Sequence, residues 1–311
     1  MNLEPSSQLN LFSHKEEFQK LINLYKNNNL PNKILFSGEK GIGKCTLAYH
    51  LINYILSSNE DFIYDLDNLK IIPDNKSFKL VQNKSNPNFI LVDIQEEKKN
   101  IDISQIRNLI LTLNQSSFNT KPRFILIDNI ELLNINAVNA LLKILEEPND
   151  NINFILINNN KRILPTLKSR CLTFKINLTF QQSMLISNQI LDDNIFDLIN
   201  PDLINYYNTP GEIINLITFS KEKNIELKDY TLINLLNLLI DNGYYKKNKF
   251  VKNLLINFIE LFFLKEYKLN EKRGALVSFY HVFIKKINNT EKFNLDEESL
   301  FLELKSKLLN G

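Results

Sequence analysis

A strand, a glycine-rich loop and a helix follow one another between residues 32 and 58, and this succession constrains the fold more than any other feature. The run "NKILFSG" is typical of a short buried strand, and "KCTLAYHLINYILSS" has the apolar spacing of a helix. Between them, Gly38, Gly41, Gly43 and Lys44 of "GEKGIGKCT" fit a phosphate-binding loop. Backbone N–H groups of such a loop surround phosphates, and the lysine adds positive charge.

The loop departs from its usual pattern at the residue after the lysine. Cys45 stands where a serine or threonine hydroxyl normally holds Mg²⁺, and a thiol is a poor partner for a cation that prefers oxygen. Thr46 comes one residue later, and on a helix its side chain is rotated by about 100° from that place. Two interpretations stay open: a loop that binds ATP or ADP, with Mg²⁺ if bound, and a loop that keeps its shape for structural reasons. Efficient hydrolysis is not expected.

Strands and helices alternate up to about residue 178, which predicts an α/β fold with a parallel sheet. Ser13 is expected to cap the first helix, with Glu16 three residues on, and Pro148 to stop the last one. Residues 59–86 are irregular and polar. The expected strands are 32–38, 88–94, 123–130 and 153–158, and the expected helices are 13–28, 44–58, 102–115 and 136–148.

The pattern changes beyond residue 178. Short helical segments appear, with a turn at "TPGE" (Thr209–Glu212), and from about residue 225 the pattern is helical throughout. We therefore expect three domains: a nucleotide-binding-type α/β domain over 1–178, a small helical domain over 179–225 and an all-helical domain over 226–311.

An acid and an amide follow the apolar strand that begins at Arg123. Asp128 stands where the second acid of a magnesium site is expected, and the alternative is an ordinary acid at the end of a strand. In ATP-hydrolysing motors of this architecture a glutamate usually comes next and polarises the attacking water. Here Asn129 comes next, and its amide cannot serve as a base. Glu131 follows two positions later, beyond the strand.

Charge, cysteine count and hydropathy exclude several classes of protein. The 37 basic and 35 acidic residues leave a net charge of +2, which is not the pattern of a protein that binds DNA mainly by itself. Two cysteines, Cys45 and Cys171, cannot form a four-cysteine zinc site, so no zinc is expected. The start lacks a signal-peptide pattern, and "LLINFIELFFL" is too short to span a bilayer and carries Glu260. We expect a cytoplasmic protein without a membrane segment.

An arginine follows the strand 153–158, within "LPTLKSRCLTF" (Leu164–Phe174). Arg170 has no obvious carboxylate partner nearby in the sequence. It is either a residue of a surface salt bridge or an arginine finger that reaches a nucleotide held by a neighbouring subunit. Composition and periodicity do not choose between these two roles.

Four blocks of the sequence resemble the clamp-loader branch of the AAA+ proteins, and most closely its delta-prime type in the bacterial DNA polymerase III clamp loader. The resemblance covers most of residues 9–178, and beyond them only the helical pattern and an "NLD" run. It implies an AAA+ P-loop parallel-sheet domain, a small helical lid and a C-terminal all-helical collar. The blocks are "LPNKILFSGEKGIGKCTLA", "RFILIDNIELLNINAVNALLKILEEP", "FILINNNKRILPTLKSRC" and "FNLDEESL".

The resemblance also implies roles by position. Asn158 matches the first sensor, a polar group that detects the γ-phosphate, and Arg170 matches the finger that completes the adjacent motor subunit's ATP site. The implied partners are motor gamma/tau and delta subunits in a hetero-pentameric ring, with the sliding clamp and primed DNA reached through the assembly. The candidate nucleotide-site residues are Gly38, Gly41, Gly43, Lys44, Cys45, Thr46, Asp128 and Asn158.

Three departures from the family pattern favour a largely non-hydrolysing stator that donates Arg170. Cys45 replaces the magnesium hydroxyl, Asn129 replaces the catalytic glutamate, and the lid segment "TPGEIINL" offers Ile213 and Ile214 where a sensing arginine is usual. Such a chain serves a DNA polymerase III holoenzyme without ATPase activity of its own. The alternatives are an ATP-hydrolysing gamma/tau-like motor subunit and an unrelated P-loop kinase. A kinase lacks support here because no convincing acceptor-binding element is present.

Overall fold

The computed structural model divides into two compact units. The boundaries predicted at residues 178 and 225 stay predictions. The first unit is Met1–Ile190 with Thr209–Gly211, and the second is Leu191–Asn208 with Glu212–Gly311. The structure describes residues 4–95, 98–114, 119–146, 151–246, 248–269, 273–293 and 296–306.

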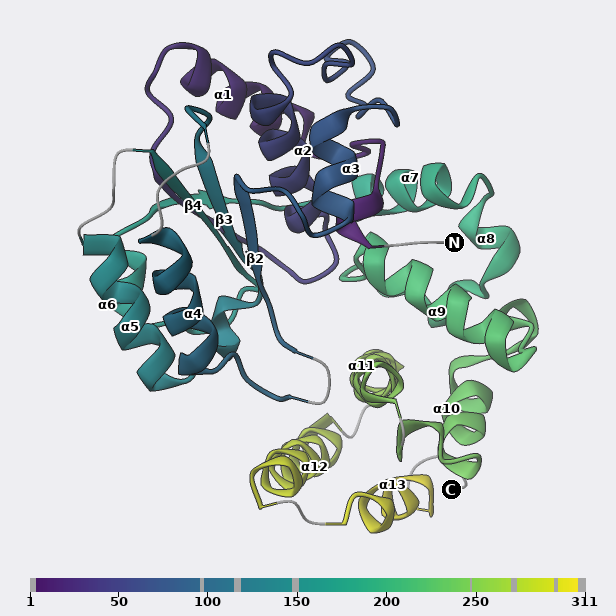
Figure 1. Ribbon diagram of the computed structural model, residues 1–311. Helices are drawn as coiled ribbons and strands as arrows, with labels where there is room; N and C mark the ends of the chain where they lie inside the picture. Colours follow the sequence, from purple (N-terminus) through teal and green to yellow (C-terminus); the bar gives the residue numbers. More distant parts are fainter. Residues whose placement is uncertain are drawn as a thin grey trace. The chain divides into compact units, whose positions relative to one another are not determined.

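A five-stranded parallel sheet forms the centre of the first unit, in the spatial order β2-β3-β4-β1-β5 (Figure 1). The middles of the central strands are apolar because both faces of the sheet are covered there. The predicted α/β class with a parallel sheet is therefore confirmed. The strands are β1 (Lys33–Ser37), β2 (Phe89–Val92), β3 (Arg123–Ile127), β4 (Ile152–Asn158) and β5 (Leu172–Lys175).

Helices cover the two faces of the sheet, and each side has its own buried core (Figure 1). Phe18, Phe36 and Leu51 belong to the core on one side, and Ile125 and Leu141 to the core on the other. The first side carries α1 (Lys15–Lys26), α2 (Lys44–Leu56) and α3 (Lys76–Gln82), and the second carries α4 (Ile103–Leu113), α5 (Ile135–Glu146) and α6 (Pro165–Lys168); α7 (Phe180–Leu191) follows β5.

The start of α1 differs from the prediction. His14, not Ser13, is the N-cap residue; it has φ 63°, and it makes no side-chain capping bond. The His14 ring makes a tertiary contact instead, since its Nε2 lies 2.6 Å from the Ile42 carbonyl oxygen in the glycine loop. The predicted stop of α5 at Pro148 lies outside the described residues.

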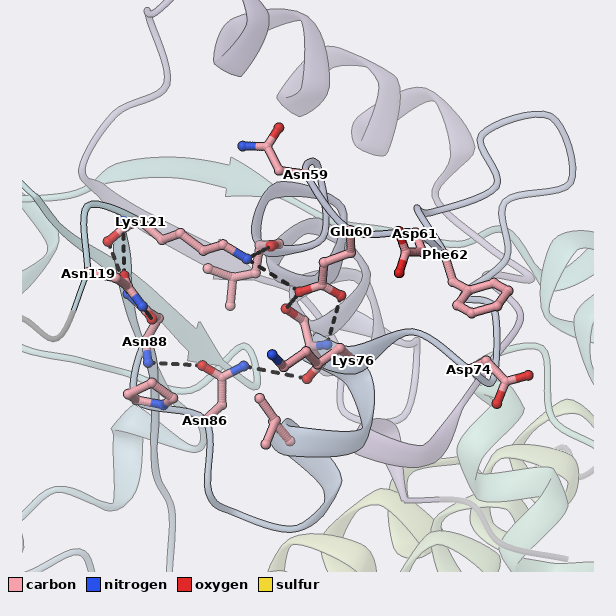
Figure 2. A pocket seen from close by; sticks show the side chains of 14 residues that line it. Asn59, Glu60, Asp61, Phe62, Asp74, Lys76, Asn86, Asn88, Asn119 and Lys121 are labelled. Atoms are coloured by element: carbon pink, nitrogen blue, oxygen red, sulfur yellow. Dashed lines mark hydrogen bonds and ion pairs between the residues drawn. The ribbon is translucent and has the colours of Figure 1, made fainter.

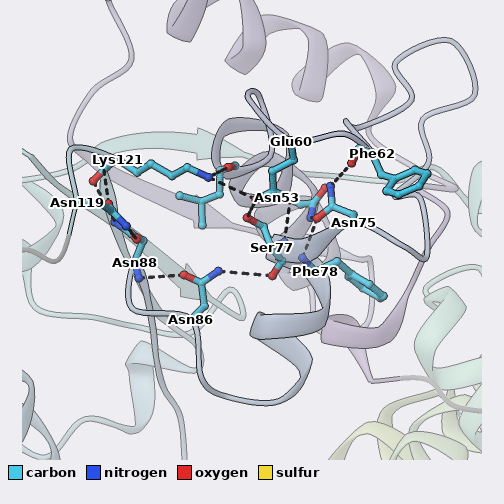
Figure 3. A network of polar contacts seen from close by, with 11 residues as sticks. Asn53, Glu60, Phe62, Asn75, Ser77, Phe78, Asn86, Asn88, Asn119 and Lys121 are labelled. Carbon is cyan, nitrogen blue, oxygen red and sulfur yellow. Dashed lines mark hydrogen bonds and ion pairs between the residues drawn. The ribbon is translucent and has the colours of Figure 1, made fainter.

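The polar segment after α2 is irregular only in part, since it contains α3. Figure 3 shows how side chains hold it: Glu60 accepts hydrogen bonds from the Ser77 backbone N–H at 3.0 Å and the Ser77 hydroxyl at 2.6 Å, and it pairs with Lys121 at 3.3 Å. Asn75 caps α3 through the Phe78 N–H. Buried polar contacts therefore anchor this segment to the end of α2 and to the turn before β3.

A cavity of 590 Å³ lies beside this network (Figure 2). Glu60 and Lys121 pair in its wall, and Asn86, Asn88 and Asn119 line the side nearer β2 and β3. Among the described residues, no group of histidine, cysteine, aspartate and glutamate side chains is arranged to hold a metal ion.

The second unit is helical in all its described elements. Leu235, Leu255 and Phe301 are buried in it, and the Phe301 ring lies 4.7 Å from the Tyr245 ring between centroids. Residues 294 and 295 of the "NLD" run lie outside the described part of the chain. Among the described helices, none is long and apolar enough to cross a membrane. The helices are α8 (Ile195–Leu198), α9 (Pro210–Lys223, which begins in the first unit), α10 (Leu232–Asp241), α11 (Lys249–Leu269), α12 (Arg273–Phe293) and α13 (Glu298–Leu304).

Candidate functional site

The carboxyl ends of four strands meet at one edge of the sheet. Gly38 follows β1, Asp93 follows β2, Asp128 follows β3 and Asn159 follows β4. Ser37 and Asn158 are directly paired at this edge, so the glycine loop starts beside the end of β4. Open parallel sheets bind their ligands outside the carboxyl ends of strands, which makes this edge the candidate site.

Lys44 is the first residue of α2, and its side chain turns back into the loop. Gly41 at φ 85° and Gly43 at φ 93° allow this turn, because both have the left-handed conformation that glycine tolerates. The Lys44 Nζ donates to the Gly38 carbonyl at 2.9 Å, the Glu39 carbonyl at 2.5 Å and the Asn159 Oδ1 at 3.0 Å. Lys44 is only 3% exposed, and this burial lowers its pKa to about 8.

Cys45 and Asp128 contact each other directly. Burial, and then the charge of Asp128, raise the pKa of the Cys45 thiol well above its ordinary value, so the sulfur stays protonated and donates to the carboxylate. Burial also raises the pKa of Asp128 to about 6, with a further contribution from Asp93. Thr46 lies in the first turn of α2 and is partly buried.

Asn129 is tied on both sides. Its Nδ2 donates to Asp93 at 2.8 Å, and its Oδ1 accepts from the Asn159 Nδ2 at 2.8 Å. Its backbone has φ 55°, a conformation that asparagine adopts more readily than glutamate. The backbone N–H of Asn129 donates to Asp128 at 2.8 Å. Position 129, where a water-activating glutamate is expected in the motors, thus carries an amide held between the ends of neighbouring strands.

Sequence reasoning did not single out Asn159, the next asparagine after the proposed sensor. The Asn158 amide donates to the Lys161 carbonyl at 3.0 Å, while Asn159 reaches Lys44 and also donates to Glu131 at 2.8 Å. The sensor role of Asn158 stays a prediction. The only sequence signal was the run of three asparagines at 158–160, and it does not tell which side chain faces the loop.

The loop is packed on its outer flanks as well. The His14 Nε2 lies 2.6 Å from the Ile42 carbonyl, and because burial lowers the pKa of His14 the neutral ring donates this bond. The Gly41 carbonyl accepts from the Gly211 N–H at 2.9 Å. A Cβ on Gly41 would lie 2.6 Å from the Thr209 hydroxyl oxygen, so the two segments approach as closely as glycine allows.

Arg170 follows α6 and has a carboxylate partner after all. It forms an ion pair with Glu146 at the end of α5, and its Nη1 donates to the Thr166 carbonyl at 2.8 Å. The side chain is 29% exposed. The sequence expectation of no local partner missed Glu146 because it lies on another helix.

Ile213 and Ile214 of α9 are both 2% exposed, so apolar core residues occupy the segment expected to sense phosphate.

The donor set fits a phosphate better than a magnesium ion. Backbone N–H groups of the loop and the Lys44 ammonium are the groups that bind phosphates. Cys45 offers sulfur in place of a hard oxygen ligand, and its proton occupies the Asp128 carboxylate. The site therefore has the parts to hold a polyphosphate, and it lacks a carboxylate at position 129 to activate water.

Comparison with known proteins gives one family and a set of relatives. The family model described as "DNA polymerase III, delta subunit" matches residues 13–179. The DNA polymerase III subunit delta' of Buchnera aphidicola subsp. Schizaphis graminum is 27% identical over 88% of this chain and 83% of its own. The delta' subunit of Pseudomonas aeruginosa is 32% identical over 44% of this chain and 40% of its own.

A gamma-subunit relative matches over a smaller part of the chain, and a solved structure matches with lower identity. The DNA polymerase III subunit gamma of the same Buchnera is 27% identical over 58% of this chain and 47% of its own. Among solved structures, the RuvB branch-migration motor of Thermotoga maritima is 14% identical, with a TM-score of 0.42 over 97% of this chain and 86% of that one.

Proposed function

Since the chain belongs to the DNA polymerase III delta-subunit family, we propose that it is a delta-prime-type clamp-loader subunit that does not itself hydrolyse ATP at a useful rate. It would act as a stator in the ring and complete the ATP site of a neighbouring motor subunit. Other clamp-loader subunits, of gamma/tau and delta type, are its proposed partners. The sliding clamp and primed DNA would be reached through the assembly.

The observation that carries this proposal is the environment of Asn129. The side chain bonds to Asp93 on one side and to Asn159 on the other, so it is held in place and supplies no base. A general base must be able to take a proton from the attacking water, and a neutral amide cannot. The Cys45 thiol on Asp128 supports the same conclusion, because the magnesium side of the site is altered as well.

Nucleotide binding is a separate part of the proposal. The loop amides and Lys44 would bind the phosphates of ATP or ADP without turning them over. When bound, Mg²⁺ would neutralise phosphate charge, and Asp128 is the oxygen ligand that the chain offers for it. The proposal needs no metal in the loop, since the neighbour's site performs the hydrolysis.

Arg170 is the residue proposed to act on the neighbour. Its side chain is 29% exposed, and the guanidinium is oriented by the Thr166 carbonyl and by Glu146. A planar guanidinium with several donors suits a γ-phosphate and neutralises the charge that develops on it. Glu146 would share or release the arginine when the neighbouring nucleotide arrives.

The decisive experiment is the Arg170→Ala variant in the assembled clamp loader. Arginine fingers are worth about 10³–10⁵ in rate, so turnover at the adjacent motor site should fall by at least about 10³. The measurement is ATP hydrolysis by the full ring with clamp and primed DNA, from which the contribution of that one site should disappear. Arg162→Ala is the matched control, because Arg162 is exposed in the same β4–β5 connection. If the Arg170→Ala ring hydrolyses ATP like the control, Arg170 is not the finger.

A second candidate function is that of an ATP-hydrolysing motor. Glu131 favours it, because its carboxylate accepts a hydrogen bond from Asn159, and Asn159 in turn accepts one from Lys44 of the loop. ATP hydrolysis by the purified chain, with and without primed DNA and clamp, separates the two functions. Turnover that disappears in a Lys44→Ala variant would establish the motor.

A further inference from the structure

The Lys44 ammonium has no donor left for a phosphate. It has three N–H groups, and three protein oxygens accept from it: the carbonyls of Gly38 and Glu39 and the Oδ1 of Asn159. Two of these acceptors belong to the loop itself. The third comes from the segment after β4, which makes Asn159 the side-chain acceptor that lies outside the loop.

Asn159 is held so that its oxygen faces Lys44. Its Nδ2 donates to the Asn129 Oδ1 at 2.8 Å and to the Glu131 Oε1 at 2.8 Å, which uses both of its N–H groups. Its backbone N–H donates to the other oxygen of Glu131 at 3.3 Å. Because both partners of the Nδ2 are acceptors, the reversed amide would face them with oxygen and Lys44 with nitrogen, so the orientation is fixed.

We propose that Asn159 is a latch that competes with phosphate for Lys44, so that a polyphosphate ligand must displace the Asn159 amide before the lysine can bind it. The proposal rests on the proposed function only in treating the loop as a nucleotide site. It adds a regulatory contact: whatever moves Asn129 or Glu131 also loosens the latch. Asn129 and Glu131 thereby hold the Asn159 oxygen against Lys44.

Removing a latch and removing a sensor should change the affinity for nucleotide in opposite directions. A sensor contacts the bound γ-phosphate, so its removal weakens ATP binding, whereas removal of a latch frees a donor of Lys44 and tightens binding of any polyphosphate. ADP separates the two because it lacks the γ-phosphate. Adenosine serves as a further probe, because it has no phosphate and should be indifferent to the latch.

The experiment measures ADP, pyrophosphate and adenosine binding to the full-length chain by calorimetry, without divalent cations. A hydrogen bond to a charged group contributes about 1.5–3 kcal/mol, so Asn159→Ala should bind ADP and pyrophosphate about tenfold more tightly or better. Adenosine affinity should not change. Asn159→Ser, whose side chain is too short to reach Lys44, should behave in the same way and replaces the alanine variant if that one folds poorly.

Asn160→Gly is the matched control. Asn160 is the next amide, donates to the Glu39 carboxylate at 2.5 Å and has φ 55°, where glycine fits without strain. The latch is overturned if Asn159→Ala binds ADP as the wild type does, or more weakly, or if Asn160→Gly tightens binding equally. If neither wild type nor Asn159→Ala binds ADP, the latch is also overturned. None of these results depends on the Arg170 assay, so failure of the latch and failure of the stator function are distinguishable.

Discussion

A methyl group at position 211 should strain the glycine loop, because the first turn of α9 touches the loop backbone there. A Cβ on Gly211 would lie 2.8 Å from the Gly41 Cα and 3.0 Å from the Gly41 carbonyl oxygen. Both atoms belong to the main chain, so no side-chain rotation relieves the clash. The same methyl group pushes apart the Gly211 N–H and the Gly41 carbonyl, which are 2.9 Å apart.

The expected cost combines three contributions. Overpacking of this kind costs about 1–3 kcal/mol. Loss of the backbone hydrogen bond adds about 1 kcal/mol. Alanine restricts the unfolded chain more than glycine does, and this effect stabilises the folded variant by about 0.4–1 kcal/mol. Gly211→Ala should therefore lower the free energy of unfolding by about 2 kcal/mol, which corresponds to about 4–8 °C in the unfolding temperature of a unit of this size.

Differential scanning calorimetry of the full chain measures this change. The matched control is Gly274→Ala on α12, because a Cβ on Gly274 meets no atom within 4 Å. That exchange in a helix should leave stability unchanged or raise it by up to about 1 kcal/mol. A Gly211→Ala protein that unfolds at the wild-type temperature would refute the reasoning, because the added methyl group would then fit beside Gly41 without a clash.

Two further substitutions test the electrostatics of the first unit. Burial raises the pKa of Asp128 from 3.8 to about 6, so its ionisation costs stability above pH 6 and the cost disappears below pH 3.8. Asp128→Asn should raise the free energy of unfolding by about 3 kcal/mol near pH 8 and change it little below pH 3.8, as measured by urea titration. Glu60→Ala should destabilise by about 2–3 kcal/mol, because Ser77 and Lys121 lose a mostly buried acceptor. Glu298→Ala in the second unit is the control, because it removes a half-exposed ion pair with Lys246 and should leave the midpoint of the same titration close to that of the wild type.

The sequence predicted the elements that carry strong apolar patterns. The strands β1, β3 and β4 lie inside the sheet, and burial on both of its faces requires runs of apolar residues there. The strand β2 lies at an edge and was predicted because all four of its residues are apolar. The strand β5 was not predicted, because Leu172–Lys175 is short, lies at the edge of the sheet and mixes apolar with polar residues. The cap at Ser13 was wrong because His14 occupies the N-cap position and its ring bonds to the Ile42 carbonyl of the loop, a tertiary contact that the local pattern does not show.

In the candidate site too, the sequence predicted the residues that follow a local pattern and missed those that depend on tertiary contacts. Gly41, Gly43 and Lys44 could be placed from the sequence because their spacing alone defines the loop. Which amide after β4 reaches Lys44 depends on the direction of single side chains, so Asn159 could not be told from its neighbours. The pairing of Arg170 with Glu146 joins two helices that approach only in the folded chain. Contacts of this kind depend on tertiary structure and leave no local pattern.

The ion pair between Arg170 and Glu146 has a consequence for the order of events in assembly. A free arginine side chain samples many rotamers, and fixing it costs about 2 kcal/mol of entropy. Glu146 and the Thr166 carbonyl restrict Arg170 while the chain is still alone. That entropy is lost during folding, before any neighbour is met. A subunit built in this way presents its guanidinium in a narrow range of directions at the first encounter.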